Sequence, residues 1–414
     1  MKAKIFIYLI IIGLVALSAN AAGLSSARAV AMGGAYIGLA KGVYAPLYNP
    51  ANIGLSGYKE YGVEIASAGA EIANNSFTLS DYNKYTGAVL TEEDKSVILG
   101  KIPSEGLKIS AEAEAGALSA SLNSLVISIN GNAATEVNLG KDALELFLMG
   151  NQINDSFSLG GMYSEAIAYI SVGLSYGRPV YKFGTRQLAV GGTVKYIKGL
   201  AYEKVTELHG GVVTLITGFQ GDGTMIAHTA EGGNGYGIDV GAALKLSDSY
   251  TAGLTFSNLL SHISWNTCTE EHGYHFEFDA ISLEDMDNDS IIVTDDYSID
   301  IPGFGSRLPV VMRTGVAKTD GKILWAVDYI QGFRLAAGSS TKPRIAAGGE
   351  YRPFRRTPVR AGLALGGGKR AVFSLGFGFE LPVFYMDIAL SNNSTLAFNA
   401  TKGLHLALST GLKF

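Results

Sequence analysis

The chain has 414 residues, of which 32 are Lys or Arg and 37 are Asp or Glu, so its formal net charge at pH 7 is −5. It contains 53 Gly and 21 Tyr but a single cysteine. The sequence lacks a basic patch of the kind that nucleic-acid binding requires, and one cysteine excludes an intrachain disulfide and a cysteine zinc cluster. The G-x-S-x-G and HExxH motifs are also absent. We therefore expect no nucleic-acid partner, no cofactor and no catalysed reaction.

Residues 1–21 have the pattern of a secretory signal peptide. Lys2 and Lys4 precede an apolar run over residues 5–17, and Ala19-Asn20-Ala21 follows it. A charged start, a short apolar core and an A-x-A site together predict cleavage before Ala22. The alternative is an uncleaved anchor, but the apolar run is short for a transmembrane helix.

Residues 22–55 are rich in Gly and Ala and show no sustained alternation of polar and apolar side chains. Gly33-Gly34 and Asn49-Pro50 are turn signals. Such a segment is too rich in small residues to face lipid. We predict that it forms a hatch inside a barrel built by residues 56–414. The alternative is a tail on the periplasmic side.

Polar and apolar side chains alternate at period two along most of residues 56–414, as strands do. Outer-membrane barrels of single chains have even strand numbers. We therefore predict fourteen strands and expect one candidate to fail, the weakest being 107–119, whose apolar face is mostly Ala. The fifteen candidates are 61–69, 107–119, 124–131, 166–177, 186–197, 202–217, 236–246, 250–258, 308–317, 323–331, 343–351, 357–365, 371–381, 383–391 and 404–414.

Ten charged residues of these candidates lie on the face opposite the apolar one. A charge that faces lipid near the midplane costs about 2–4 kcal/mol, whereas a lumen tolerates it. A β-sandwich also alternates, but it rarely has so many strands of about ten residues. We therefore predict an all-β, antiparallel transmembrane barrel in outer-membrane lipid. The predicted lumen-facing charges are Lys195, Asp239, Lys245, Arg313, Asp328, Arg344, Glu350, Arg360, Glu380 and Asp387.

The last residues, GLHLALSTGLKF, form the expected closing strand. Their alternating leucines end at Leu412 and Phe414, with no polar tail after the aromatic residue. A terminal aromatic on an alternating strand is typical of outer-membrane barrels. We take Leu412 and Phe414 as the signal through which the barrel-assembly machinery would recognise the chain.

Three insertions interrupt the strands. A capping-box start at Thr91 predicts a short helix that ends near Ile102, and residues 141–149 (KDALELFLM) predict a second one. Residues 267–306 hold eleven acidic residues and no Lys or Arg. We expect this segment to be a long outer loop.

The acidic segment contains one candidate metal site, although we expect no resident metal. Asp285, Asp287, Asp289 and Asp296 occupy positions 1, 3, 5 and 12 of a calcium-loop pattern, but Ser290 stands where Gly is wanted. The alternative is a solvated acidic loop without a bound ion.

The N-terminal run SSARAVAMGGAYIGLAKGVYAPLYNPANIGL resembles the start of the long-chain fatty-acid transporter (FadL-like) superfamily. Members typically read Arg-Ala-x-Gly-Gly-Ala and later Asn-Pro-Ala, which here are Arg28, Gly33-Gly34 and Asn49-Pro50. Residues 235–266 look like hairpins of PorV-like and TraF-like proteins. The resemblance implies a fourteen-stranded barrel closed by a hatch, with lateral exit of hydrophobic ligands at a kinked strand. Lys41 departs from the acidic residues of many transporter hatches.

These patterns are compatible with two functions. The first is an outer-membrane channel or carrier for small, hydrophobic molecules, with the hatch as its closure. The second is an interaction or secretion-accessory (PorV-like) barrel that shuttles or anchors exported proteins, for which the acidic segment and the helical insertions speak.

Overall fold

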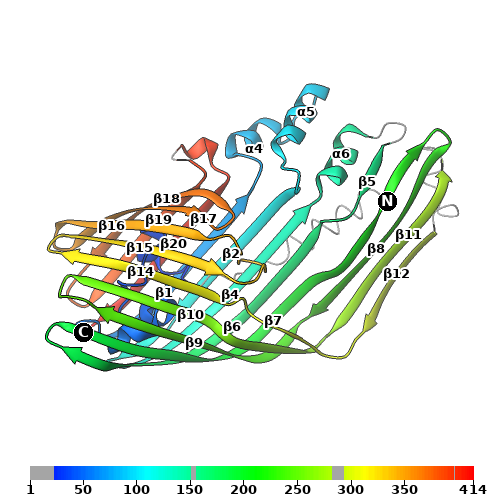
Figure 1. Cartoon of the computed structure of the whole chain (residues 1–414). Coiled ribbons are helices and arrows are strands. Elements are labelled where there is room, and N and C mark those ends of the chain that lie inside the picture. Colours follow the sequence, from blue (N-terminus) through cyan, green and yellow to red (C-terminus); the bar gives the residue numbers. More distant parts are fainter. Residues whose placement is uncertain (1–22, 151–154, 282–292, 396) are drawn as a thin grey trace.

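The computed structural model describes residues 23–150, 155–281, 293–395 and 397–414, and the predicted signal peptide lies outside them. Fourteen antiparallel strands close into a barrel, as the alternation predicted, because β20 pairs with both β19 and β1 (Figure 1). In order around the barrel the strands are β1 (Tyr61–Asn74), β2 (Leu107–Ala117), β4 (Leu125–Leu139), β6 (Tyr163–Phe183), β7 (Arg186–Leu215), β9 (Gly232–Lys245), β10 (Tyr250–Thr267), β14 (Val311–Asp320), β15 (Ile323–Gly332), β16 (Arg344–Phe354), β17 (Thr357–Gly366), β18 (Lys369–Glu380), β19 (Phe384–Asn393) and β20 (Gly403–Lys413).

The expectation that 107–119 is the weakest candidate was wrong, since this segment contains β2. Hydrogen bonding to β1 on one side and β4 on the other holds β2 along its length despite its alanine-rich face. The candidates 186–197 and 202–217 are instead one strand, β7. Gly199, which lies between the two candidates, stands where a Cβ would collide with the ring of Trp265. The glycine therefore makes room for packing and does not end the strand.

The second half of β7 leaves the barrel and continues into a projecting sheet, the wall extension. It pairs with β8 (Gly218–Ala230), which pairs with β11 (Glu270–Ile281), which pairs with β12 (Val293–Asp300). Two short strands, β5 (Ser156–Ser158) on β7 and β13 (Phe304–Ser306) on β10, complete this side. At about 3.3 Å per residue, the thirty residues of β7 span about 100 Å, and Figure 1 shows them rising beyond the barrel.

The prediction of a long outer loop over 267–306 was therefore wrong for the described residues. Much of the segment is strand, in β11, β12 and β13. All eight residues of β12 are exposed. A strand without a buried face has no apolar alternation to reveal it, so its polarity resembles that of a loop.

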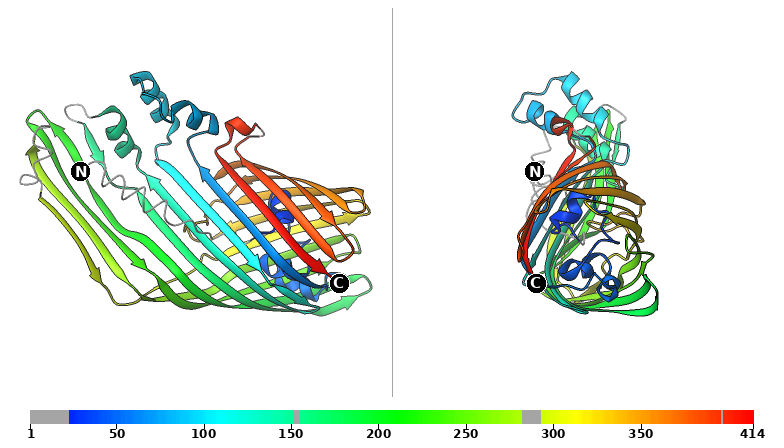
Figure 2. Two further views of the ribbon diagram at one scale, coloured as in Figure 1. Left: turned by 180° about the vertical axis from the view of Figure 1, so that it is seen from behind. Right: turned by 90° about the vertical axis from the view of Figure 1, so that its left-hand side faces the viewer.

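The two ends of the barrel differ in the length of their connections. Short turns at residues 184–185, 321–322 and 355–356 mark one end, called the turn end, where Phe414 also lies. The other, called the loop end, carries residues 75–106, 140–150 and 155–162 (Figure 2). Outer-membrane barrels show the same asymmetry between their periplasmic and extracellular ends.

The helices between strands lie at the loop end. The predicted helices are present as α5 (Glu92–Lys101) and α6 (Lys141–Met149), and α4 (Leu79–Tyr85) was not predicted. Thr91 and Asp94 form the expected capping box of α5. The hydrogen bonds from Thr91 lower the pKa of the Asp94 carboxyl below its usual value. No helix within the described residues is long and apolar enough to cross a membrane.

The barrel has its apolar side chains outside and its polar ones inside. Along β20, Leu406 and Leu408 are exposed, whereas His405 and Ser409 are buried. The strand β15 alternates in the same way, with Val327 exposed and Asp328 buried. This arrangement is the reverse of a soluble protein, and a contiguous exposed apolar surface of this kind needs an apolar surrounding.

Residues 23–58, called the internal segment, lie within the barrel (Figure 2, dark blue). They contain the short helical turns α2 (Ala27–Ala31), η1 (Gly42–Tyr44), α3 (Ala45–Tyr48) and η2 (Pro50–Gly54). The chain then leaves at the turn end to begin β1. A short strand there, β3 (Ala120–Leu122), bridges β1 and β4.

The wall extension is expected to be dispensable for barrel closure. Gly199 of β7 already pairs with Gly233 of β9, and Trp265 of β10 pairs with Phe304. Excision of residues 201–230 and 268–303, each replaced by a short Gly-Asn turn, keeps all fourteen barrel strands. We expect the variant to retain the heat-modifiable gel migration of a folded barrel. A variant that migrates only as unfolded protein would contradict this assignment.

Candidate functional site

The internal segment is seated on parts of the inner wall that have no side chains. Gly348, Gly362 and Gly376 lie on the neighbouring strands β16, β17 and β18. A Cβ at any of the three would overlap atoms of residues 31–33 in and after α2. Gly33 turns here with a φ of +69°, a conformation that glycine adopts without strain. The three wall glycines and the predicted hatch residue Gly33 thus permit backbone to lie directly on backbone, whereas a Cβ at Gly34 would meet only the Arg344 side chain at 3.9 Å.

Carboxylates of the wall accept hydrogen bonds from backbone amides of the internal segment. The Asp328 Oδ2 atom accepts from the amides of Tyr36 and Ile37 at 2.7 and 2.9 Å. Glu114 accepts from the amides of Gly23 and Leu24 at 2.7 and 3.0 Å. Irregular backbone has no helical or strand partner for these amides, and burying them unpaired is costly. The carboxylates therefore supply what secondary structure would otherwise supply.

A buried charge network ties α2 to the wall. Arg28 donates to Glu350 at 2.9 Å, and Glu350 also accepts from Arg360 at 2.6 Å and from Arg352 at 2.7 Å. Arg360 continues to Asp387 at 2.5 Å. Each charge has an opposite charge beside it, as buried ions require. Arg352 in turn pairs with Glu380 at 2.8 Å. The predicted hatch residue Arg28 and four of the predicted lumen charges, Glu350, Arg360, Glu380 and Asp387, therefore belong to one network.

Asn49 and Pro50 fix the far side of the internal segment. The Asn49 side chain caps η2 by accepting from the amide of Ala51, and it donates to the carbonyl of Ala242 on β9 at 2.9 Å. Pro50 is the first residue of η2, where a missing amide proton costs nothing. Gly241 on β9 faces Asn49 and has no room for a Cβ.

The remaining predicted lumen charges serve separate purposes. Lys195 pairs with Asp239 at 2.8 Å. Lys245 pairs with Asp248 in a turn at the turn end. The Arg313 guanidinium lies 5.4 Å from the ring centre of Tyr48, and Arg344 donates to the carbonyl of Gly33 at 3.1 Å. The structure therefore does not gather them into one site.

A cavity of about 740 Å³ lies between the internal segment and the loop end. Leu24, Pro46 and Leu47 of the internal segment line it, as do residues near the loop ends of most strands. Residues 338–342, in the connection between β15 and β16, also line it. The turn before them is held inward because the Ala337 amide donates to Glu165 on β6 at 3.2 Å.

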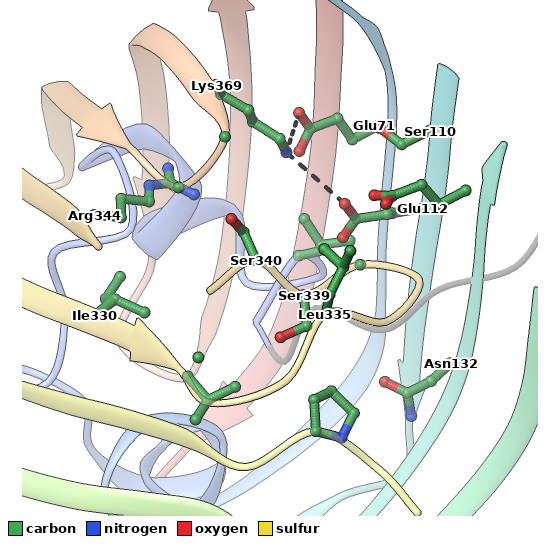
Figure 3. Close-up of a pocket in the computed structure, with 18 of the residues that line it drawn as sticks. Glu71, Ser110, Glu112, Asn132, Ile330, Leu335, Ser339, Ser340, Arg344 and Lys369 are labelled. Atoms are coloured by element: carbon green, nitrogen blue, oxygen red, sulfur yellow. Dashed lines mark hydrogen bonds and ion pairs between the residues drawn. The ribbon is translucent and has the colours of Figure 1, made fainter. Parts of the chain in front are cut away.

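Ion pairs and amides form part of the cavity lining. Lys369 reaches across to Glu71 at 2.6 Å and lies 3.8 Å from Glu112, and Figure 3 shows both contacts. Asn132 lies on the wall beside them (Figure 3). The sequence led us to expect hydrophobic cargo, and this lining combines apolar surface with charged and amide groups.

Sequence reasoning missed Glu71, Glu112, Glu114 and Lys369. The signal for two of them was present, because AEAEA within β2 alternates Ala with Glu at period two. The small apolar side chains of that strand obscured the signal. Nothing in the local pattern could show that Glu114 binds backbone amides about ninety residues earlier in the chain.

The closing strand β20 is hydrogen-bonded at both of its edges. Leu412 pairs with Val63 of β1 and Phe384 of β19, and the Phe414 amide donates to the carbonyl of Tyr61.

The calcium candidate is only partly described. Asp285, Asp287 and Asp289 lie outside the described residues, whereas Asp296 lies in β12. Within the described part of the chain, no group of three or more His, Cys, Asp or Glu side chains is arranged to hold a metal ion.

Comparisons with known proteins give one family and several solved structures. Residues 50–232 match a family described as "Family of unknown function (DUF5723)". The comparison with curated proteins found no match.

The solved structures that resemble the chain include three transporters or transporter homologues. The Ralstonia pickettii toluene transporter TbuX is 12% identical, with a TM-score of 0.48 over 95% of this chain and 98% of that one. The Pseudomonas putida toluene transporter TodX is 10% identical, with a TM-score of 0.47 over 93% and 96%. A Pseudomonas aeruginosa FadL homologue is 11% identical, with a TM-score of 0.48 over 96% and 98%.

Substitution of Gly362 tests whether the internal segment needs a bare inner wall. In Gly362→Val the new side chain overlaps the backbone of Met32 and Gly33, and overpacking of this kind costs about 1–3 kcal/mol. We expect trypsin to cleave after Arg28 and Lys41 about tenfold faster or more. Gly349→Val is the matched control. Gly349 follows Gly348 on β16, but a Cβ at Gly349 would meet only the carbonyl of Leu324, at an ordinary contact distance. Equal cleavage rates in the two variants would disprove the seating.

Substitution of Asp328 tests the carboxylate anchor. Asp328→Leu leaves the amides of Tyr36 and Ile37 without their acceptor, which we expect to destabilise the local structure by about 3 kcal/mol. Hydrogen exchange at these two amides measures the change. In Asp328→Asn one oxygen remains to accept, so the loss is expected to be about 1 kcal/mol. The carboxylate anchor is disproved if, in both variants, the amides of Tyr36 and Ile37 exchange at the same rate as in the unaltered protein.

Proposed function

We propose that this protein is an outer-membrane channel or carrier for small molecules, in which the internal segment is the hatch. The observation that carries the proposal is the cavity above the internal segment. It lies at the loop end, and Leu24, Pro46 and Leu47 contribute to its lining from below. A barrel whose lumen is occupied at one end and hollow at the other suits controlled passage better than free diffusion or a purely structural role.

The exterior of the barrel supports a membrane location. Exposed apolar side chains such as Ile345, Leu375 and Leu408 cover strands of about ten to twelve residues. Transmembrane strands of 9–11 residues suffice to cross a bilayer when tilted. We infer that the turn end faces the periplasm and the loop end the cell exterior.

The cargo is proposed from two observations of different kinds. The hatch motif around Arg28 and Asn49 resembles that of the FadL-like superfamily, and this resemblance favours hydrophobic cargo. The cavity lining, with Asn132, Lys369 and Glu112, favours molecules that also carry polar groups. We therefore propose small molecules with an apolar body and neutral polar groups.

Uptake into liposomes tests the proposal. The full-length protein, a variant lacking residues 23–55 and the milder Asp328→Leu variant are reconstituted and supplied with toluene, phenyl glucoside and benzoate. We expect the hatch variants to carry solute at least tenfold faster than the full-length protein, because they free the lumen. Absence of flux of every probe in all three proteins would overturn the proposal.

A second candidate function, an anchor or shuttle for exported proteins, rests on the wall extension. Within the described residues β12 pairs on one side only, with β11, so its other edge is free. A photo-crosslinking residue at Thr294 in β12 would capture a protein partner in intact cells. If the only crosslinks are to lipid or to the chain itself, this candidate is excluded.

A further inference from the structure

The cavity wall formed by β4 and β6 carries a compact group of neutral polar side chains. This group, called the amide patch, consists of Ser128, Asn130 and Asn132 on β4 and Ser171 on β6. Asn130 pairs with Ser171 across the two strands, and all four residues line the cavity. They are 5–9% exposed, so each is buried in the wall except where it meets the cavity.

The side chains of the amide patch are poorly satisfied by the protein. No hydrogen bond joins the Asn130 amide or the Ser128 hydroxyl to another described residue. Asn132 and Ser171 make only long bonds, of 3.4 and 3.5 Å, to the backbone carbonyl of Asn130. Buried polar groups in folded proteins almost always have a partner. The missing partner must therefore come from the cavity.

Glycines pair with the amide patch on both neighbouring strands. Gly116 of β2 pairs with Asn130, and a Cβ there would meet the side chains of Ser67 and Glu64. Gly173 of β6 pairs with Ser128, and a Cβ there would meet the Ser128 hydroxyl. Tyr169 pairs with Asn132 and also lines the cavity, so an aromatic ring borders the patch.

The charged residues that pair with strands of the amide patch already have partners. Lys195, which pairs with Gly173, donates to Asp239 at 2.8 Å and to Asn258 at 2.6 Å. Glu114, which pairs with Asn132, accepts from the internal segment. An ionic ligand would have to compete with these contacts, and an apolar ligand would leave the amides unpaired. Hydroxyl groups, which both donate and accept, match amides and hydroxyls.

We propose that the amide patch is a subsite for an uncharged, polyhydroxylated group, such as the sugar ring of a small glycoside. This inference rests on the proposed function and deepens it, because it names the polar part of the cargo. Asn130 and Asn132 offer two carboxamides about 7 Å apart on one face of β4. They bind hydroxyls of the ring, while the aromatic edge at Tyr169 contacts its apolar face.

Calorimetric titration of the full-length protein in lipid nanodiscs tests the subsite. The probes are phenyl β-glucoside, glucose, benzoate and toluene. We expect saturable binding of the glucoside and weaker binding of glucose, and at least tenfold weaker binding of benzoate. In Asn130→Leu/Asn132→Leu the affinity for the glucoside falls about tenfold or more, as the loss of two hydrogen bonds predicts.

Two further variants keep the test decisive. Ser128→Ala removes a single hydroxyl and is expected to weaken the glucoside about threefold without a threat to folding. Asn234→Leu, an exposed asparagine of β9 that does not line the cavity, should leave binding unchanged. Absence of saturable glucoside binding, or binding that the patch variants do not alter, overturns the inference and means that water alone fills the patch.

The outcome is distinguishable from failure of the proposed function. If toluene or benzoate crosses liposomes but no glucoside binds, the subsite is wrong and the channel stands. If the glucoside binds at the patch but no probe crosses in any hatch variant, the channel is wrong and the subsite stands.

Discussion

The interior of this barrel depends on pairing the backbone of a segment that has almost no regular secondary structure. Short helical turns leave many amides of residues 23–58 without an intrasegment partner, and water cannot reach them at the wall. Asp328 and Glu114 each accept two of these amides. A carboxylate is a suitable acceptor because charge strengthens the bond, and the amides in return compensate for its burial. The hydrogen bonds thus offset both the cost of burying the amides and the cost of burying the carboxylates.

This dependence explains why the chain contains so many glycines. Where backbone must approach a carboxylate or a strand closely, the wall can carry no side chain, and glycines such as Gly315 beside Asp328 stand at these points. The glycines weaken individual strands. Closure of the barrel offsets that weakness, because each of its fourteen strands has two hydrogen-bonded neighbours and none of them forms an edge. Only a closed sheet could tolerate so many glycines on its inner face.

The alternation of side chains at period two predicted much of the barrel, whereas contacts between distant residues could not be predicted. Alternation indicated the fourteen strands, the closing strand at Leu412–Phe414 and the inward direction of Asp328 and Glu350, since these depend on local geometry. It could not reveal β12, where both faces are exposed, nor assign Glu114 to the amides of Gly23 and Leu24. A carboxylate has the same local pattern whether it meets water, a lysine or backbone.

The same distinction bears on how the cavity is interpreted. A lumen charge in a barrel can stabilise the protein or contact a solute, and its partners decide between these roles. Glu350, Arg360 and Asp387 are paired with one another and with Arg28, so they hold the internal segment. The neutral side chains of the amide patch have no such partners. Groups that the protein has left unpaired at a cavity, and not its most highly charged residues, are therefore the ones available to a ligand.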